Sequence, residues 1–332
     1  MSDTARLLAD SVAAFLGRNR GVDESELFRH LQDNGFALAL ASDDHGGLGA
    51  TWLEAATIAR VWGYHAAPLP IVELLLAGRV ASLAGEPLLA ARLTIAPRAA
   101  SSDGRVVAAV FPGAEFCATA DGIVPIGAPT ATSIAGEPIV GLETDPSGVR
   151  QLEPMPDQDE LLRQGALLVA AQMLGAMERI SEIVTDHVTV RSQFGRPLAK
   201  FQLVQTMVAD AASEIDVAKA AVERALGALD DGRTDKIGWL AAKSQAGRAA
   251  TVVAANAHQA MGAIGFTQEH ELHTLTRRLW AWRDAWVGQS EADEAVGRLA
   301  CAAGYDGLWP LVADRAQQGG VGAPAPQGTL NV

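Results

Sequence analysis

The second half of the chain is dominated by apolar residues that recur at steps of three and four. This spacing places them on one face of an α-helix, so it predicts long helices that each bury one side in a core. The first helix begins near Asp157, because Asp157 or Asp159 can cap a helix start and Glu160 is favourable close to a helix N-terminus. Its apolar stripe comprises Leu167, Ala170, Leu174, Met177, Ile180, Val184 and Val188.

A second stripe follows at the same spacing and ends at Asp230-Asp231-Gly232. It comprises Leu203, Met207, Ala211, Ile215, Ala218, Val222, Ala225 and Leu229. A third helix is expected over about residues 235–260, and shorter helices over about 268–284 and 290–303. Three long antiparallel helices and a shorter one, joined by short turns, predict a four-helix bundle over residues 154–316.

The first 153 residues divide into two parts. Residues 1–90 also have helical spacing, with a first apolar face formed by Leu7, Leu8, Val12, Ala13 and Phe15 and a second by Leu27, Leu31 and Phe36. Residues 91–153 instead contain short β-rich runs, at 93–96, 106–111, 122–126 and 139–142, separated by glycine, proline and aspartate. The segment can hold a few strands and no large sheet.

The predicted fold is therefore α+β and mostly α. It has an N-terminal helical domain (1–90), a reduced middle β-domain (91–153) and a C-terminal four-helix bundle (154–316). Residues 317–332 contain few residues that could join a core, and we expect them to be disordered.

Composition narrows the function. The 332 residues carry a formal net charge of −13, which argues against a general surface for nucleic acid. Anionic ligands would therefore need a local pocket of arginine or backbone N–H groups. No apolar run is long enough for a membrane span, and no signal peptide is visible at the start. Cys117 and Cys301 have neither metal nor redox spacing, so a reducing cytoplasm is the expected setting.

The segment Arg191-Ser192-Gln193-Phe194-Gly195-Arg196-Pro197, followed by Phe201-Gln202, separates the first two long helices. One interpretation is an ordinary helix end, with Gly195 as the C-cap and Pro197 stopping the helix. The other is a ligand contact, in which the planar guanidinium of Arg191 meets a pyrophosphate. Phe194 would then pack on a flavin or its ribityl chain.

A second turn lies at the end of the third predicted helix, in Ala257-His258-Gln259-Ala260-Met261-Gly262-Ala263-Ile264-Gly265-Phe266. Its glycines allow a ligand to approach the backbone closely, although glycine is also a common helix stop. Two such turns in this order and spacing favour a shared cofactor over coincidence.

These motifs resemble the acyl-CoA dehydrogenase family over nearly the whole chain. Arg191 to Gly195 with Phe201-Gln202 is similar to the family's R-x-x-F-G…Q element, and Gln259 to Phe266 to its Q-x-x-G-G-x-G-(Y/F) element, with Ala263 in place of the second glycine. The glycine-rich run Asp43 to Gly49 matches a turn after the family's early helices. By this resemblance the chain contacts the ADP part of FAD in a neighbouring subunit. The implied contacts are Arg191, Ser192, Gln193, Phe194, Phe201, Gln202, Gln259, Met261, Gly262 and Ala263.

The chain departs from the family at the groups that perform the chemistry. The β-domain lacks the loops resembling T-E-x-x-x-G-S-D and W-x-T-N that hold the flavin ring and substrate, the nearest string being Arg98 to Gly104. Dehydrogenation also needs a carboxylate to remove the α-proton. The family places this glutamate in a loop that here aligns it with Val287, or early in the long helix, which here reads Gln164-Gly165-Ala166. The resemblance therefore implies no catalytic residue in this chain.

Three carboxylates near these positions remain as alternative bases: Glu160, Asp284 and Glu291. Exposed carboxylates at helix ends are common, which makes each a weak candidate. Trp280, Trp282 and Trp286 form a cluster that could line an apolar pocket or an interface, or simply pack a helix. His270 and His273 are expected on a solvated helix face, and no metal site is predicted.

Three functions are compatible with these residues. The chain most resembles the shorter subunit of α2β2 acyl-CoA dehydrogenases that act on steroid side-chain CoA thioesters. That resemblance implies a heterotetrameric flavoprotein of steroid or lipid catabolism, with a full-length subunit, an acyl-CoA substrate and an electron-transfer flavoprotein or similar acceptor as partners. The alternatives are a self-sufficient homomeric dehydrogenase with a displaced base and a flavin-free interaction protein of the same fold.

Overall fold

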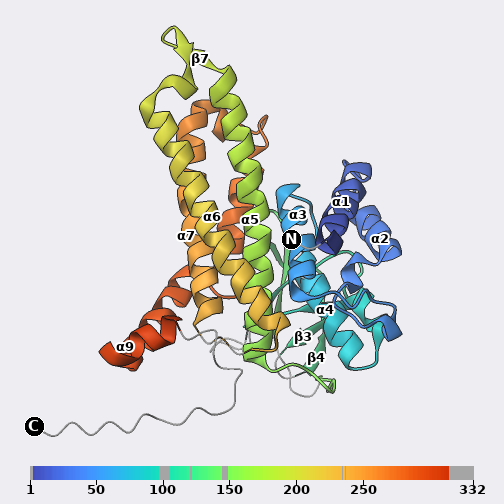
Figure 1. The fold of residues 1–332 in the computed structure, drawn as a ribbon. Coiled ribbons are helices and arrows are strands. Elements are labelled where there is room, and N and C mark those ends of the chain that lie inside the picture. Colours follow the sequence, from blue (N-terminus) through green and yellow to red (C-terminus); the bar gives the residue numbers. More distant parts are fainter. Residues whose placement is uncertain are drawn as a thin grey trace, which may run out of the picture.

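The computed structural model consists of a helical N-terminal part, a small region of strands and a long helical bundle (Figure 1). The structure describes residues 3–96, 105–119, 122–143, 149–233, 235 and 237–313, with the side chains of 105, 106, 142, 143 and 313 left out. The Arg98–Gly104 string and the segment 317–332 lie outside these residues. The predicted α+β, mostly helical class is confirmed, with the three regions in the expected order.

The N-terminal part contains α1 (Asp3–Arg18), α2 (Glu24–Asn34), α3 (Trp52–Tyr64) and α4 (Ile71–Leu83), with short 3₁₀ turns at Phe36–Leu38, Asp43–His45 and Pro87–Arg92. Phe15 and Trp62 are buried at its centre, with their rings stacked 6.4 Å apart. The predicted face of the first helix is wrong at Leu7, whose side chain is 66% exposed. The next residue, Leu8, is half-buried and packs against the core, so Leu7 lies outside the buried face of α1.

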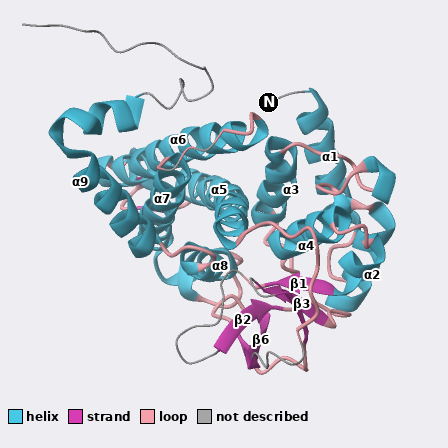
Figure 2. Ribbon diagram, turned by 90° about the horizontal axis from the view of Figure 1, so that it is seen from below, coloured by secondary structure: helices cyan, strands magenta, loops and turns pink. Residues whose placement is uncertain are grey.

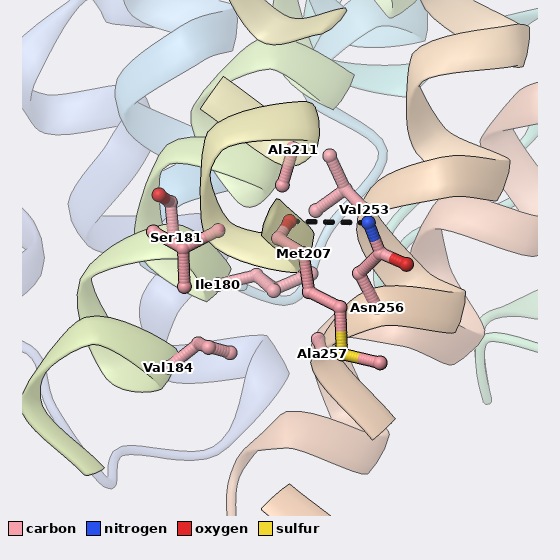
Figure 3. A pocket seen from close by; sticks show the side chains of 9 residues that line it. Ile180, Ser181, Val184, Met207, Ala211, Val253, Asn256 and Ala257 are labelled. Carbon is pink, nitrogen blue, oxygen red and sulfur yellow. Dashed lines mark hydrogen bonds between the residues drawn. The ribbon is translucent and has the colours of Figure 1, made fainter. Parts of the chain in front are cut away.

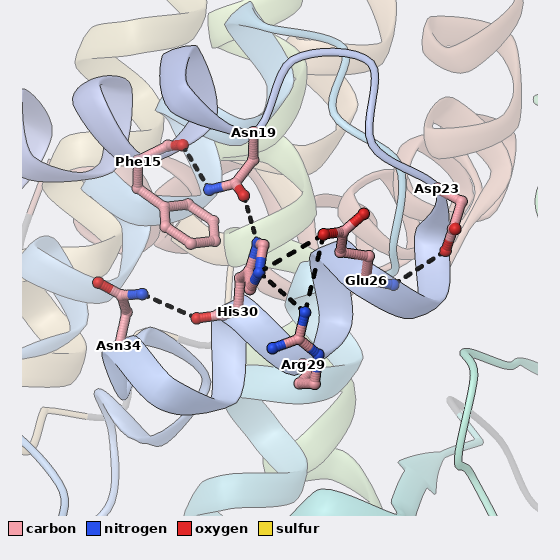
Figure 4. A network of polar contacts seen from close by, with 7 residues as sticks. All are labelled: Phe15, Asn19, Asp23, Glu26, Arg29, His30 and Asn34. Carbon is pink, nitrogen blue, oxygen red and sulfur yellow. Dashed lines mark hydrogen bonds and ion pairs between the residues drawn. The ribbon is translucent and has the colours of Figure 1, made fainter.

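Polar contacts hold the turn between α1 and α2 (Figure 4). The side chain of Asn19 donates to the carbonyl of Phe15 (2.8 Å), and its oxygen lies 2.5 Å from Nδ1 of His30 on α2. Asp23 caps α2 by accepting from the backbone N–H of Glu26. Asn19 therefore links the end of one helix to the side of the next.

The middle region forms two three-stranded sheets, which lie together on one side of the helices (Figure 2). One sheet has the order β1-β3-β4, with β1 (Leu93–Ile95) parallel to β3 (Phe116–Thr119) and β4 (Gly122–Pro125) antiparallel to β3. The other has the order β2-β6-β5 and is antiparallel. It contains β2 (Arg105–Ala109), β5 (Ala131–Thr132) and β6 (Pro138–Glu143).

The bundle consists of α5 (Gln158–Val190), α6 (Gln202–Asp230), α7 (Gly238–Met261), α8 (Leu272–Asp284) and α9 (Gln289–Ala313). Asp157 caps α5 as predicted, accepting from the backbone N–H of Glu160 at 2.7 Å. Every residue of the first predicted stripe, Leu167 to Val188, is buried. The second stripe is buried from Ala211 onwards except for the half-buried Leu229, but Leu203 at the start of α6 is 68% exposed.

Glycines let the N-terminal helices approach the bundle closely. A methyl group on Gly175 of α5 would overlap the carbonyl of Arg60 on α3, and one on Gly63 would overlap the carbonyl of Gln172. Only glycine permits such backbone contact. Helices α3 and α5 are therefore fixed against each other, and this fixes the start of α5 relative to the N-terminal part.

The interior between α5, α6 and α7 is closely packed. A cavity of only about 10 Å³ remains there, walled mainly by apolar side chains such as Ile180, Met207 and Val253 (Figure 3). The side chain of Asn256 on α7 donates to the backbone carbonyl of Met207 on α6 at 3.1 Å. This bond holds α6 and α7 together near the end of the bundle.

The last helix, α9, packs on α7 at its start and then projects from the bundle (Figure 1). Its backbone is kinked at Gly304 (φ 66°, ψ −176°), and Tyr305 and Trp309 beyond the kink are exposed. Among the described residues, no helix has the length and apolar character that a membrane crossing requires.

Candidate functional site

The Arg191–Pro197 segment is a two-residue β-hairpin at the far end of the bundle (Figure 1). Helix α5 ends at Val190, after which β7 (Ser192–Gln193) pairs with β8 (Arg196–Pro197). The turn residues Phe194 (φ 53°) and Gly195 (φ 78°) both have positive φ, as tight hairpin turns with right-handed strand twist require. The prediction of Gly195 as a C-cap is therefore wrong, since Gly195 is a hairpin turn residue and Arg191 is the cap of α5.

The hairpin presents its side chains to solvent. Phe194 is 90% exposed, and its ring lies edge-on to that of Phe201, with centroids 6.3 Å apart. The guanidinium of Arg196 lies 4.1 Å from the centre of the Phe201 ring, a cation–π arrangement. The predicted contacts Arg191, Ser192, Gln193 and Gln202 are also exposed.

The second predicted element follows α7 directly. Gly262 has φ 64° and ψ −146°, a conformation essentially reserved for glycine, and it opens the 3₁₀ turn η6 (Gly262–Phe266). Gln259, Gly262 and Ala263 are exposed, whereas Met261 is 5% exposed and its side chain points into the core. Only the backbone of Met261 could reach a ligand on this surface.

Both elements lie at the same end of the bundle, because α5 runs towards the hairpin and α7 returns to that end (Figure 1). Burial lowers the pKa of His187 in the last turn of α5, with the charge of Arg191 and that of His270 beyond η6 as further causes. Residues 191–205 contain three cations, Arg191, Arg196 and Lys200, and no acid. The segment 191–205 is thus locally positive on a chain of net charge −13.

Exposed apolar side chains surround these cations. We call them the bundle-end patch, which comprises Val190 (83% exposed), Phe194 (90%), Leu203 (68%), Ile264 (44%) and Phe266 (70%). The ring of Phe266 stacks on His258 at 4.3 Å, and Nε2 of His258 lies 3.0 Å from the hydroxyl of Thr276. An exposed apolar patch crossed by arginines is suited to an aromatic, anionic ligand or to another subunit.

The two positions where the resemblance would place a base are linked through Trp286, the residue before Val287. Val287 is 3% exposed, and the neighbouring Trp286, also 3% exposed, lies over Gly165 on α5. A methyl group on Gly165 would overlap the indole ring. Neither position carries a group that can accept a proton.

The three alternative carboxylates are placed differently. Glu160 forms an ion pair with Arg79 at 3.2 Å and accepts a hydrogen bond from the side chain of Gln164 at 2.6 Å. Asp284 is paired with its neighbour Arg283, and Glu291 is exposed at the start of α9. Glu160 and Glu291 lie in the first turns of α5 and α9, where a carboxylate is favourable without a catalytic role, and Asp284 ends α8 beside Arg283.

One carboxylate that the sequence analysis overlooked lies at the base positions. Oε1 of Glu73 on α4 accepts a hydrogen bond from the indole N–H of Trp286 at 3.1 Å. Burial raises the pKa of Glu73 to about 7. The available signal was an acid inside the apolar run Ile71–Leu76, since such residues are seldom buried without a partner.

The neighbouring tryptophan is arranged in a similar way. Trp282 is 5% exposed on α8, and burial raises the pKa of Glu137, with the nearby Trp282 side chain acting in the opposite direction. The carbonyls of Trp282 and Arg283 accept from Nζ of Lys243 at 3.0 and 2.7 Å. Lys243 is fully buried, which lowers its pKa to about 7. This lysine ties the C-terminal end of α8 to α7, as a cation suits a helix C-terminus.

Trp280 differs from the other two tryptophans. It is half-buried, with the guanidinium of Arg283 4.5 Å from its ring centre. The predicted tryptophan cluster thus separates into one partly exposed ring, Trp280, and two buried rings, of which Trp286 is hydrogen-bonded to a carboxylate. His270 and His273 are half-buried, and among the described residues no group of three or more His, Cys, Asp or Glu could hold a metal.

The chain is similar in sequence to known acyl-CoA dehydrogenases. Residues 156–292 match the family model described as acyl-CoA dehydrogenase, C-terminal domain. The acyl-CoA dehydrogenase IpdE2 of Mycobacterium tuberculosis is 26% identical over 279 residues, which cover 81% of this chain and 84% of that protein.

Solved structures share the fold at lower identity. A steroid ACAD complex, Tcur3481-Tcur3483, has a TM-score of 0.75 at 24% identity, covering 90% of this chain and 96% of the other. The ChsE4-ChsE5 complex from Mycobacterium tuberculosis has a TM-score of 0.74 at 20% identity, covering 91% and 98%. At these identities both similarities show a shared fold. Both solved structures are named as pairs of proteins.

Proposed function

This chain belongs to the acyl-CoA dehydrogenase family, and we propose that it is a non-catalytic subunit of a hetero-oligomeric member. In this proposal a full-length partner subunit supplies the base and the contacts to the flavin ring. The present chain completes the partner's FAD site with its hairpin and with η6. It is required for activity but does not itself remove a proton.

One contrast carries the proposal. The elements that resemble the family's nucleotide contacts are exposed together at one end of the bundle, with their arginines directed to solvent. The base positions, by comparison, hold Val287 and Gly165, and both are buried under or beside an indole. In this proposal a chain with this combination holds a nucleotide and leaves the deprotonation of the thioester to its partner.

The exposed residues fit the ADP part of FAD. Arg191 would hold the pyrophosphate, because its planar fork matches two phosphate oxygens. The polar side chains of Ser192, Gln193, Gln202 and Gln259 can bond the ribose and phosphates, and Gly262 leaves open space for the ligand, as a methyl group there would meet nothing within 4 Å. FAD, when bound, supplies the hydride acceptor for α,β-dehydrogenation.

The bundle-end patch supports a partner subunit as well as a cofactor. Phe194, Leu203 and Phe266 are large apolar side chains that stay in water unless another surface covers them. Hetero-oligomers cover such surfaces extensively. A partner seated here would bring its FAD against Arg191.

The names of the relatives suggest the substrate class. The solved complex Tcur3481-Tcur3483 is described as a steroid ACAD, and the fold is shared over nearly the whole chain. We infer a steroid side-chain CoA thioester as substrate, with an electron-transfer flavoprotein or similar acceptor taking the electrons.

A test is to locate the base in the purified complex. The partner's glutamate is replaced by glutamine, and in separate complexes Glu160, Asp284 and Glu291 of this chain are each replaced by alanine. We expect the partner variant to lose nearly all activity with an artificial electron acceptor and the three alanine variants to retain it. An inactive alanine variant with full FAD content would favour the self-sufficient homomer with a displaced base.

A further inference from the structure

The contact between Trp286 and Gly165 closes a space inside this chain. Trp286 has φ 63°, an unfavourable backbone conformation for a large side chain. Such strain persists only where surrounding contacts enforce it, and it is frequent at functional sites. Here the enforcing contacts are the face of α5 at Gly165 and the carboxylate of Glu73.

The location of the space follows from the two base positions. Acyl-CoA dehydrogenases that place the base at either position must remove the same α-proton, so both positions border the α-carbon of a bound thioester. In this chain those positions correspond to Val287 and the segment Gln164–Ala166. The indole of Trp286 lies against that segment at Gly165 and thus fills the place of the acyl group.

Two hydrogen bonds fix this filling from separate parts of the chain. Glu73 on α4 accepts from Trp286, and the carbonyl of Ile134, between β5 and β6, accepts from Nε of Arg277 on α8 at 2.8 Å. The turn between α8 and α9 is thereby bonded to the N-terminal helices, and α8 to the β-domain. A side chain held in this way resists displacement by a substrate.

We propose that Trp286 permanently occupies this chain's own acyl-binding space, so that each pair of subunits binds one thioester, in the partner. The inference rests on the proposed function for the identity of the space. The filled space itself is a property of this chain alone and can be tested without FAD or a partner.

The experiment compares the wild-type chain with Trp286→Ala. The probes are hexanoyl-CoA and the small neutral thioester S-ethyl hexanethioate, which needs no site for CoA. We expect no binding to the wild type by calorimetry, and binding of at least the small thioester to the variant, with its acyl chain over Gly165 in a crystal structure. Removal of an indole leaves an apolar cavity that a hydrocarbon chain of this size can enter.

Trp62→Ala is the matched control, because Trp62 is also fully buried but lies in the N-terminal core. It should not bind a thioester over Gly165. If an alanine variant does not fold, the corresponding leucine variants replace the pair. The inference is overturned if the wild type binds either probe over Gly165, or if the folded Trp286 variant binds neither. A complex without FAD would contradict the proposed function and leave this result unchanged.

Discussion

Replacing Gly165 by alanine is expected to destabilise the protein only while Trp286 is present. In the wild type the new methyl group overlaps the indole, so the ring or the helix must shift. Overpacking of this kind costs about 1–3 kcal/mol, against a gain of about 1 kcal/mol from the higher helix propensity of alanine. The net change is a loss of up to about 2 kcal/mol.

With Trp286 already replaced by alanine, the sign should reverse. Trp286→Ala alone costs about 3–5 kcal/mol, as for other large-to-small changes in a core. The ring is then absent, so Gly165→Ala should recover about 1 kcal/mol through helix propensity. The two positions are therefore coupled by about 1–3 kcal/mol, the overpacking cost itself, as residues in direct contact often are.

The assay is urea unfolding of all four proteins, followed by far-ultraviolet circular dichroism. Gly227→Ala in both backgrounds is the control, because Gly227 also lies within a helix and a methyl group there would meet nothing within 4 Å. It should stabilise both backgrounds equally. An effect of Gly165→Ala that is the same in both backgrounds would show that the indole does not lie on Gly165.

Three further predictions concern charged groups. Arg191→Ala in the complex should weaken FAD binding about ten- to a hundredfold, since charge-assisted hydrogen bonds contribute about 1.5–3 kcal/mol. The free energy of unfolding of this chain should stay unchanged, because the side chain is exposed. Fluorescence titration of the apo complex with FAD measures the affinity, and an affinity equal to that of the wild type would count against a pyrophosphate contact. The pKa of Glu73, raised from 4.5 to about 7, means that the folded protein holds a proton that the unfolded chain releases. Stability should thus fall by about 3 kcal/mol as the pH rises through that interval, and a Glu73→Gln variant with an undiminished fall would refute this. The pKa of Lys243 is lowered from 10.5 to about 7, so between these pH values the unfolded chain holds a proton that the folded protein has released, and stability should rise with pH. Denaturant titrations of Lys243→Met should lack that rise.

The helical framework could be predicted because periodicity records burial along a single element. The stripe from Leu167 to Val188 faces a continuous core, and each of its members is buried. The same spacing predicted burial of Leu203, which is exposed because no described element of this chain covers the start of α6. Periodicity identifies an apolar face but does not say whether the same chain or another one covers it.

The hairpin could be found as a motif but not as a structure. Strands of two residues have no periodicity, and the positive φ of Phe194 is rare for an aromatic residue. Strand β3 (Phe116–Thr119) was missed by the sequence prediction, because Phe116-Cys117-Ala118-Thr119 is not the run of β-branched residues that identified its neighbours.

The contacts around the base positions could not be predicted from the sequence for a different reason. The bond between Glu73 and Trp286 joins residues 213 positions apart. The sequence suggests only that a carboxylate in an apolar helix needs a partner, and that a tryptophan cluster packs against something. The burial of Lys243 could not be predicted either, because a lysine in an alanine-rich helix is normally expected in solvent. Only the structure shows the two backbone carbonyls on α8 that accept from its ammonium group.

The ratio of FAD to polypeptide tests the central claim most directly. This chain is purified alone and after co-expression with a full-length acyl-CoA dehydrogenase subunit, and flavin absorbance is compared with the chain composition of each sample. The account predicts no FAD and no activity for the chain alone, and one FAD for each pair of subunits in an active complex. A homomer of this chain that holds one FAD per polypeptide and oxidises an acyl-CoA would contradict it, and a complex without flavin would indicate an interaction protein that keeps only the fold.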